Sequence, residues 1–108
     1  MIEIELQYNQ LDVDTYLALR AGVSWKRLSR EQAQLALERS IYVVTAYQNG
    51  QCVGMGRLVG DGAVICYVQD LIVLPQVQGQ GIGSKILSAL KEYVEKLRIP
   101  DTEMMFSL

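Results

Sequence analysis

Three glycines at alternate positions mark a segment of this 108-residue chain whose spacing by itself suggests chemistry. The segment reads Gln78-Gly79-Gln80-Gly81-Ile82-Gly83-Ser84 and joins an apolar, strand-like stretch to a helix-like one. In the first turn of a helix, several N–H groups lack a partner within the helix, and the helix dipole adds positive potential. Glycines let a ligand approach such a backbone closely. The segment therefore predicts a site for phosphate or pyrophosphate that needs neither a metal nor a lysine.

Two other phosphate-binding motifs fit the glycine segment poorly. A Walker loop needs Gly-x-x-x-x-Gly-Lys-Ser/Thr, whereas the lysine here, Lys85, follows Ser84. A dinucleotide fingerprint needs Gly-x-Gly-x-x-Gly within a parallel βαβ unit, which the chain does not complete, although Asp101 lies at a suitable distance. A glycine-rich turn without a ligand is the third alternative. It would cost about 1 kcal/mol for each glycine inside the helix without an obvious return.

One acidic residue stands alone in the apolar stretch before the glycine segment. Asp70 is the only acid between Ala63 and Leu74, where a carboxylate is costly unless it is solvated or paired. It is therefore a candidate general base, acting directly or through water. The alternative is a structural role, either paired with Arg57 or accepting bonds from backbone N–H groups. Strand alternation predicts that Tyr67 and Gln69 lie on the opposite face from Asp70.

Three further side chains are candidates for contact with a substrate. Trp25, the only tryptophan, and Tyr67 could line a pocket, although core packing or anchoring of a loop explains them at least as well. Arg57 lies in a glycine-flanked strand and could bind an acidic group. An arginine in such a strand is more often an ion-pair partner.

The composition excludes several classes of site. The chain has no histidine, and its two cysteines, Cys52 and Cys66, are too few for a Cys-only zinc site and are expected to be buried free thiols. The net charge is −2, and the scattered basic residues form no stripe for nucleic acid. No apolar run reaches the ~18 residues of a membrane span, and the N-terminus does not look like a signal peptide. We therefore expect no metal, no nucleic-acid or membrane partner, and a soluble, cytoplasmic protein.

The hydrophobic pattern predicts eight elements in the order β-α-α-β-β-β-α-β. Asp12 or Asp14 caps the first helix and Gly22 ends it, while Ser29 begins the second with a capping box to Gln32. An Asn49-Gly50 turn joins two of the strands. The expected ranges are strand 2–7, helix 12–21, helix 30–39, strands 41–47, 51–59 and 63–74, helix 81–97 and strand 102–108.

The glycine segment and this order of elements together resemble the GNAT superfamily of N-acetyltransferases. Gln78-x-x-Gly81-x-Gly83 matches the Gln/Arg-x-x-Gly-x-Gly/Ala signature, and Leu71-Ile72-Val73-Leu74-Pro75 ends the strand before it. The resemblance runs from Ile2 to Leu108. It implies an α+β fold: one N-acetyltransferase-like domain over 1–108, with a mixed, mostly antiparallel sheet flanked by helices.

The resemblance also implies roles for the residues. An acetyl group would pass from acetyl-CoA, the co-substrate, to a primary amine of a small molecule or peptide by direct attack, so Cys52 and Cys66 are not expected to be nucleophiles. Backbone amides would hold the pyrophosphate, and the residues concerned are Gln78, Gly79, Gln80, Gly81, Ile82, Gly83 and Ser84. The main chain of Leu71, Ile72 and Val73 would pair with the pantetheine arm. An N–H at Ile72 or Val73 would polarise the thioester carbonyl.

The chain also departs from the family pattern. Members usually continue with another helix and two more strands, and that helix commonly carries a tyrosine that protonates the leaving thiolate. Three explanations are open: the protein is longer, which we favour, a second chain supplies the strands, or the chain is a remnant. A CoA-binding or sensing module without catalysis, or an interaction protein with a decayed site, is therefore an alternative function. Family members are often dimers and an uncovered edge strand favours pairing, so a homodimer is a further expectation.

Overall fold

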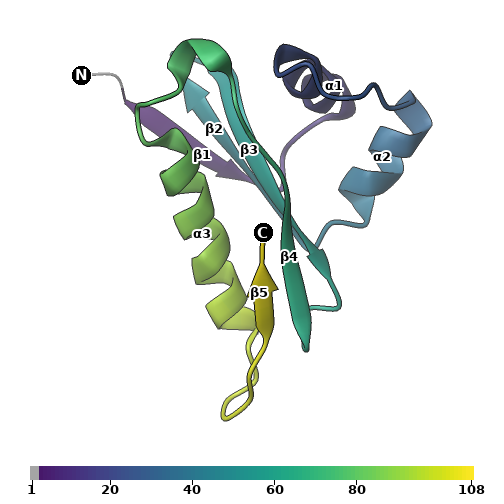
Figure 1. Ribbon diagram of the computed structural model, residues 1–108, viewed down its shortest axis with the longest axis vertical. Helices are drawn as coiled ribbons and strands as arrows, with labels where there is room; N and C mark the ends of the chain where they lie inside the picture. Colours follow the sequence, from purple (N-terminus) through teal and green to yellow (C-terminus); the bar gives the residue numbers. More distant parts are fainter. Residues whose placement is uncertain (1–2) are drawn as a thin grey trace.

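The computed structural model describes residues 3–108 and contains a five-stranded sheet with helices on both faces (Figure 1). The strands are β1 (Ile4–Tyr8), β2 (Tyr42–Gln48), β3 (Gln51–Gly60), β4 (Ile65–Val73) and β5 (Met105–Ser107). The helices are α1 (Val13–Gly22), α2 (Arg30–Glu38), α3 (Ile82–Leu97) and a short 3-10 helix, η1 (Pro75–Val77). The predicted order and the mixed, mostly antiparallel sheet are confirmed. Ile2, the predicted start of the first strand, lies outside the described residues.

The strands lie side by side in chain order, and only the last pair is parallel. β5 pairs with Ile65, Cys66 and Tyr67, the first three residues of β4. From residue 68 to 73, β4 therefore has β3 on one side and, within residues 3–108, no strand on the other. This stretch, called the open edge below, leads directly into η1 and the glycine segment.

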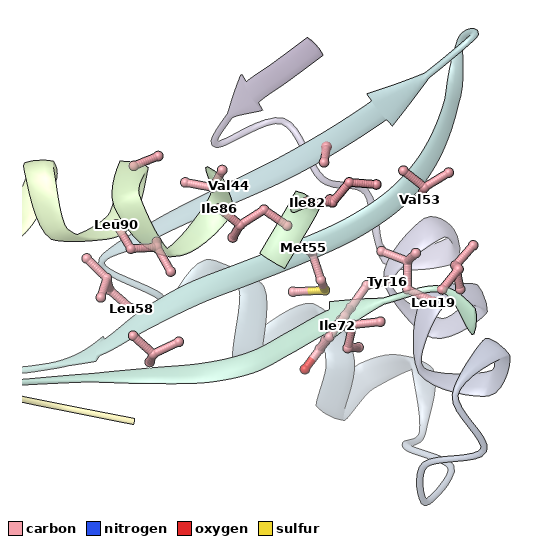
Figure 2. Close-up of a cluster of buried hydrophobic side chains, with 14 of the residues drawn as sticks. Tyr16, Leu19, Val44, Val53, Met55, Leu58, Ile72, Ile82, Ile86 and Leu90 are labelled. Carbon is pink, nitrogen blue, oxygen red and sulfur yellow. The ribbon is translucent and has the colours of Figure 1, made fainter. Parts of the chain in front are cut away.

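The core lies on both faces of the sheet, which explains why β2 reads as a continuous apolar run rather than an alternating one. α3 covers β2, β3 and β4 on one face, while α1 and α2 lie on the other (Figure 1). Gly56 allows α3 to approach closely, because a Cβ there would lie 2.9 Å from Ile86 Cγ2. Figure 2 shows buried side chains of α3, of the sheet and of α1 in this cluster; they include Tyr16, Leu19, Val44, Met55, Leu58, Ile72, Ile82 and Leu90.

The predicted helix caps are present. The Asp12 carboxylate accepts a hydrogen bond from the Thr15 N–H at 2.7 Å, and the Ser29 hydroxyl accepts one from the Gln32 N–H at 3.0 Å. The part of the predicted capping box in which the Gln32 side chain reaches back stays a prediction. None of the helices in the described part of the chain is long and apolar enough to cross a membrane.

Gly22 ends α1, as predicted, and it has a second role in packing. It is the last residue of α1, and Ser24, two residues later, takes the left-handed conformation with φ of 58°. A Cβ at Gly22 would lie 2.6 Å from Leu74 Cδ2. Glycine therefore lets the C-terminal end of α1 pack against the end of β4.

Candidate functional site

The glycine segment forms a loop whose backbone requires glycine at two positions. Gly79 and Gly81 have φ of 85° and 81°, and Gly81 is the N-cap residue of α3 and provides no side-chain hydrogen bond to it. A Cβ at either position would meet nothing within 4 Å, so the backbone conformation selects glycine and the space above the loop is open. The Lys85 N–H makes the first helical bond, to the Gly81 carbonyl at 3.1 Å. The N–H groups of 82–84 therefore precede the hydrogen-bonded part of α3 and are available to an anion.

Two glutamine side chains fix this loop beside the open edge. Gln78 Nε2 donates to the Val73 carbonyl at 2.9 Å, and Gln48 Nε2 lies 3.1 Å from Gln80 Oε1. A hollow of about 390 Å³ lies between the edge and the loop, and it is lined by Leu71, Val73, Gln78, Gly79, Gly81, Ile82, Gly83 and Ser84. The structure thus brings together most of the residues expected to hold an acyl-CoA. Ile72, which is buried, and Gln80 do not line the hollow.

The main-chain groups of the open edge alternate in direction. The Leu74 N–H donates to the Val53 carbonyl at 2.9 Å, and the Ile72 carbonyl lies toward β3, 2.9 Å from where a Cβ of Gly54 would be. The Val73 carbonyl points the other way, toward Gln78. Since the N–H and C=O of a residue in an antiparallel ladder point to the same side, the N–H group of Val73 faces the open edge. That of Ile72 faces β3.

A β-bulge interrupts β4 at Asp70. Arg57 of β3 is opposite Gln69 and Met55 is opposite Ile72, so Asp70 and Leu71 together face Gly56 alone. Asp70 has φ of 53°, a left-handed conformation that aspartate tolerates better than most residues. The extra residue breaks the alternation of faces, and the side chain of Asp70 reaches Arg57 on the face that Gln69 shares. The prediction that Gln69 and Tyr67 lie on the opposite face from Asp70 is therefore wrong.

Asp70 accepts hydrogen bonds from three side chains, and together they form the Asp70 cluster. Tyr16 donates through its hydroxyl, Arg20 through Nη1 at 2.9 Å, and Arg57 through Nε at 2.7 Å. The Asp70 side chain is only 7% exposed, and each arginine side chain is 14% exposed. Burial raises the pKa of Tyr16, as does its bond to Asp70, so the hydroxyl stays a donor at neutral pH. The predicted pairing of Asp70 with Arg57 is confirmed.

Both the sequence and the fold of the chain are similar to those of known proteins. Residues 7–104 match the model of the acetyltransferase (GNAT) family. The chain belongs to this family. Two solved structures are similar to it: a probable acetyltransferase from meticillin-resistant Staphylococcus aureus (29% identity, TM-score 0.87) and a GNAT family protein from Streptococcus pneumoniae (33% identity, TM-score 0.80). The matches cover 98% and 100% of this chain, and 78% and 74% of those chains.

The similarity extends to curated relatives of greater length. The chain is 32% identical over 84 residues to a rice protein named serotonin N-acetyltransferase 2, covering 74% of this chain and 42% of that one. It spans less than half the length of this and another curated relative that it matches. A GNAT structure at 13% identity and TM-score 0.75, an aminoglycoside N-acetyltransferase in complex with CoA, covers 100% of this chain and 78% of that one and shows the shared fold alone.

The other predicted site residues lie apart from the loop of this GNAT chain. Arg57 is held internally, because its Nη1 also lies 3.2 Å from the Ser40 hydroxyl and 3.4 Å from the Ala36 carbonyl. Tyr67 lies between Val59 and Ser107, near the start of β4. Trp25 lies in the α1–α2 connection, with its ring 5.4 Å from the Arg20 guanidinium carbon.

The cysteines of the GNAT chain are free, as expected. Burial raises the pKa of the Cys52 and Cys66 thiols, which leaves less of the reactive thiolate at neutral pH. Two features of the site had no clear signal in the sequence. These are the anchoring of the loop by Gln78 and the recruitment of Tyr16 and Arg20 to Asp70.

Proposed function

We propose that this chain binds acetyl-CoA and transfers its acetyl group to a primary amine. The observation that carries the proposal is the glycine loop itself. Its left-handed glycines, the open space above them and the N–H groups at the start of α3 lie beside an unpaired strand edge. Such a loop suits a pyrophosphate, and such an edge suits an extended chain with amide groups.

The residues present fit acetyl-CoA in two places. The N–H groups from Gly79 to Ser84 would hold the pyrophosphate, with Gly79 and Gly81 allowing its close approach. The open edge would pair with the pantetheine amides through Leu71 and Val73, whose side chains line the same hollow. Part of this edge is already occupied, because the Val73 carbonyl accepts from Gln78.

The main chain of β4 would supply the catalytic hydrogen bond. Acetyl-CoA brings a thioester carbonyl and a thiolate leaving group; the C–N bond forms, the C–S bond breaks, and the proton lost by the amine balances the one gained by sulfur. The N–H of Val73 would donate to the carbonyl oxygen as it gains charge. Ile72 is the weaker candidate, because its main-chain groups face β3.

Asp70 would support this edge from behind rather than take the proton of the amine. Its two oxygens already accept three hydrogen bonds, and its side chain is buried. The bulge that it stabilises determines which N–H groups of 71–73 face outward. A role as general base stays a prediction from the sequence.

The loop is tested with a pair of glycine variants that introduce the same charge and the same backbone strain. Gly81→Glu places a carboxylate at the proposed phosphate site, whereas Gly62→Glu places one in the β3–β4 turn, where φ is 74° and the nearest atom to a new Cβ is 3.7 Å away. We expect titration calorimetry with acetyl-CoA to show binding to wild type and Gly62→Glu, and at least a hundredfold weaker binding to Gly81→Glu, since placing like charges against each other costs several kcal/mol.

Three results would redirect the proposal. Equal affinity in both folded variants would place the phosphate elsewhere. No affinity in folded wild type would remove the proposed function. Binding without release of free CoA thiol, over a panel of primary amines, would support the alternative of a CoA-binding or sensing module.

A further inference from the structure

A second hollow lies on the opposite face of the sheet, between α1 and the start of α2. Its volume is about 470 Å³, and its lining residues include Arg20, Trp25, Arg27 and Arg30. We call it the arginine pocket. The remaining lining residues are small, apolar or hydroxylated: Leu17, Ala18, Ala21, Leu28 and Ser29. No acidic side chain is among the lining residues in the described part of the chain.

The positive charge of the arginine pocket contrasts with the chain as a whole. Between residues 20 and 30 the sequence carries four basic residues, Arg20, Lys26, Arg27 and Arg30, and no acidic one, in a protein with net charge −2. The structure gathers three of the four around one hollow. The basic residues of the full sequence form no continuous stripe, but those of 20–30 are concentrated at this hollow.

The back wall of the pocket carries charge that its own partners do not neutralise. Arg20 and Arg57 share a single carboxylate, Asp70, so the buried cluster holds one more positive than negative group. Arg20 Nη2 donates to the Lys26 carbonyl at 2.9 Å, while its buried Nε has no hydrogen-bond partner among residues 3–108. Because buried charges are weakly screened, the excess favours an anion in the neighbouring space.

The front of the pocket has cations that a ligand can reach. Arg27 is exposed and has no ion pair in the described part of the chain. Arg30 pairs with Asp14, but both side chains are largely exposed, so that pair contributes little. The Trp25 ring is 41% exposed and offers an apolar surface beside the arginines.

The arginine pocket adjoins the end of β4 at which transfer would take place. Arg20 bonds to Asp70 in the bulge, and Gly22 packs against Leu74. The pocket is lined by α1, the α1–α2 connection and the start of α2, and α1 links it to the stretch 70–74 beside the CoA hollow. An acceptor held in the pocket would approach the open edge from the side opposite α3.

We propose that the arginine pocket binds an anionic group of the acceptor, so that the acceptor is an amine that also carries a carboxylate or a phosphate. This inference rests on the proposed function for its link to transfer. The anion would sit against Arg27 and Arg30 with the excess charge of the Asp70 cluster behind it, and Trp25 would pack on the carbon chain between anion and amine. Arginine suits both anions, because its planar guanidinium binds either in a bidentate manner.

Trp25 provides a readout of the pocket that does not depend on catalysis. It is the only tryptophan of the chain, so tryptophan fluorescence reports on this pocket. The protein, saturated with CoA, would be titrated with two pairs of probes: 4-aminobutyrate against butylamine, and 2-aminoethyl phosphate against ethanolamine. We expect at least one probe with an anionic group to change the fluorescence at a concentration about tenfold or more below that of the amine without this group, the factor expected from one charge-assisted hydrogen bond.

A matched pair of variants assigns the effect to the pocket. Arg27→Gln should raise the half-saturating concentration of the preferred anionic probe about tenfold and should not raise that of the matching amine without an anionic group. Arg39→Gln removes the same charge from an exposed arginine outside the pocket and should change neither. Which anionic probe responds distinguishes a carboxylate from a phosphate.

The outcomes separate this inference from the proposed function. An equal response to amines with and without an anionic group, or an equal response of the two variants, overturns the anionic subsite even if acetyl transfer occurs. An Arg27-dependent response with a matching fall in kcat/KM for the anionic amine supports both. The same response without any acetyl transfer retains the anion site and overturns its assignment to an acceptor.

Discussion

The glycine loop and the Asp70 cluster lie close together in this GNAT chain but are built in opposite ways. The loop uses the backbone of seven consecutive residues, and over it the structure leaves open space. The cluster uses side chains from α1, β3 and β4, with Tyr16 and Asp70 separated by 54 residues. One site is thus exposed, neutral and local, and the other is buried, charged and assembled by the fold. The first should determine binding and the second stability.

The largest change in stability is expected for Asp70→Asn. The change leaves Arg20 and Arg57 buried side by side without their shared carboxylate, and we expect the free energy of unfolding to fall by about 3–5 kcal/mol. Asp14→Asn is the control, because its pair with Arg30 is exposed and should contribute less than about 1 kcal/mol. Denaturant unfolding measures both. Losses of equal size would mean that the cluster is not a structural centre.

Alanine variants of two glycines test the other region, the glycine loop. Gly81→Ala forces a left-handed conformation on alanine and should destabilise the protein by about 1–2 kcal/mol. Gly83→Ala should instead stabilise it by up to about 1 kcal/mol, since Gly83 lies within α3 and a Cβ there would make only ordinary contact, 3.6 Å from Val73.

Acetyl-CoA affinity should follow a different order from stability in these two variants. The GNAT signature accepts alanine at the position of Gly83, so binding there should change by less than about tenfold, or 1.4 kcal/mol. Gly81→Ala should weaken binding more. Thermal unfolding and calorimetry on the same samples would check this. A stable Gly83→Ala protein that had lost all affinity would show that the close approach of the ligand extends two residues further than proposed, to Gly83.

The contrast between the two regions also explains what could be predicted from the sequence. Local signals were reliable: Asp12 and Ser29 cap their helices, and Asn49 and Gly50 form a turn with φ of 53° and 78°. The glycine loop belongs to this class, because its glycines follow one another at fixed spacing.

The Asp70 cluster belongs to the other class. The sequence of β4 predicts a regular alternation of side chains between the two faces and does not indicate the bulge. Aspartate in a left-handed conformation has no distinctive neighbours in the sequence. The role of Arg20 depends on α1 packing across the sheet onto a residue 50 positions away. The arginine pocket was missed for a related reason, because its charge is evident only when residues 20–30 are considered apart from the rest.

The smallest expected effect concerns α1, whose N-cap is a local sequence signal and whose side chains form part of the Asp70 cluster. Asp12 caps α1, and hydrogen bonds from Thr15 hold the pKa of its carboxyl below the usual range. Because the pKa is lower in the folded state, the stabilisation from Asp12 is fully present above the unfolded pKa of about 4 and is lost as pH falls through the folded pKa. Asp12→Ala should therefore cost about 1 kcal/mol at pH 7 and less at pH 3.

Asp12→Asn is the matched control, because asparagine caps a helix without titrating. Its stability relative to wild type should rise as the pH falls through that range, as urea unfolding at several pH values would show. Since α1 carries Tyr16 and Arg20, a weaker cap should loosen the Asp70 cluster and leave the glycine loop, on the other face, unaffected. If Asp12→Ala lowered acetyl-CoA affinity as much as stability, the two regions would form one cooperative unit, and the division of binding from stability would fail.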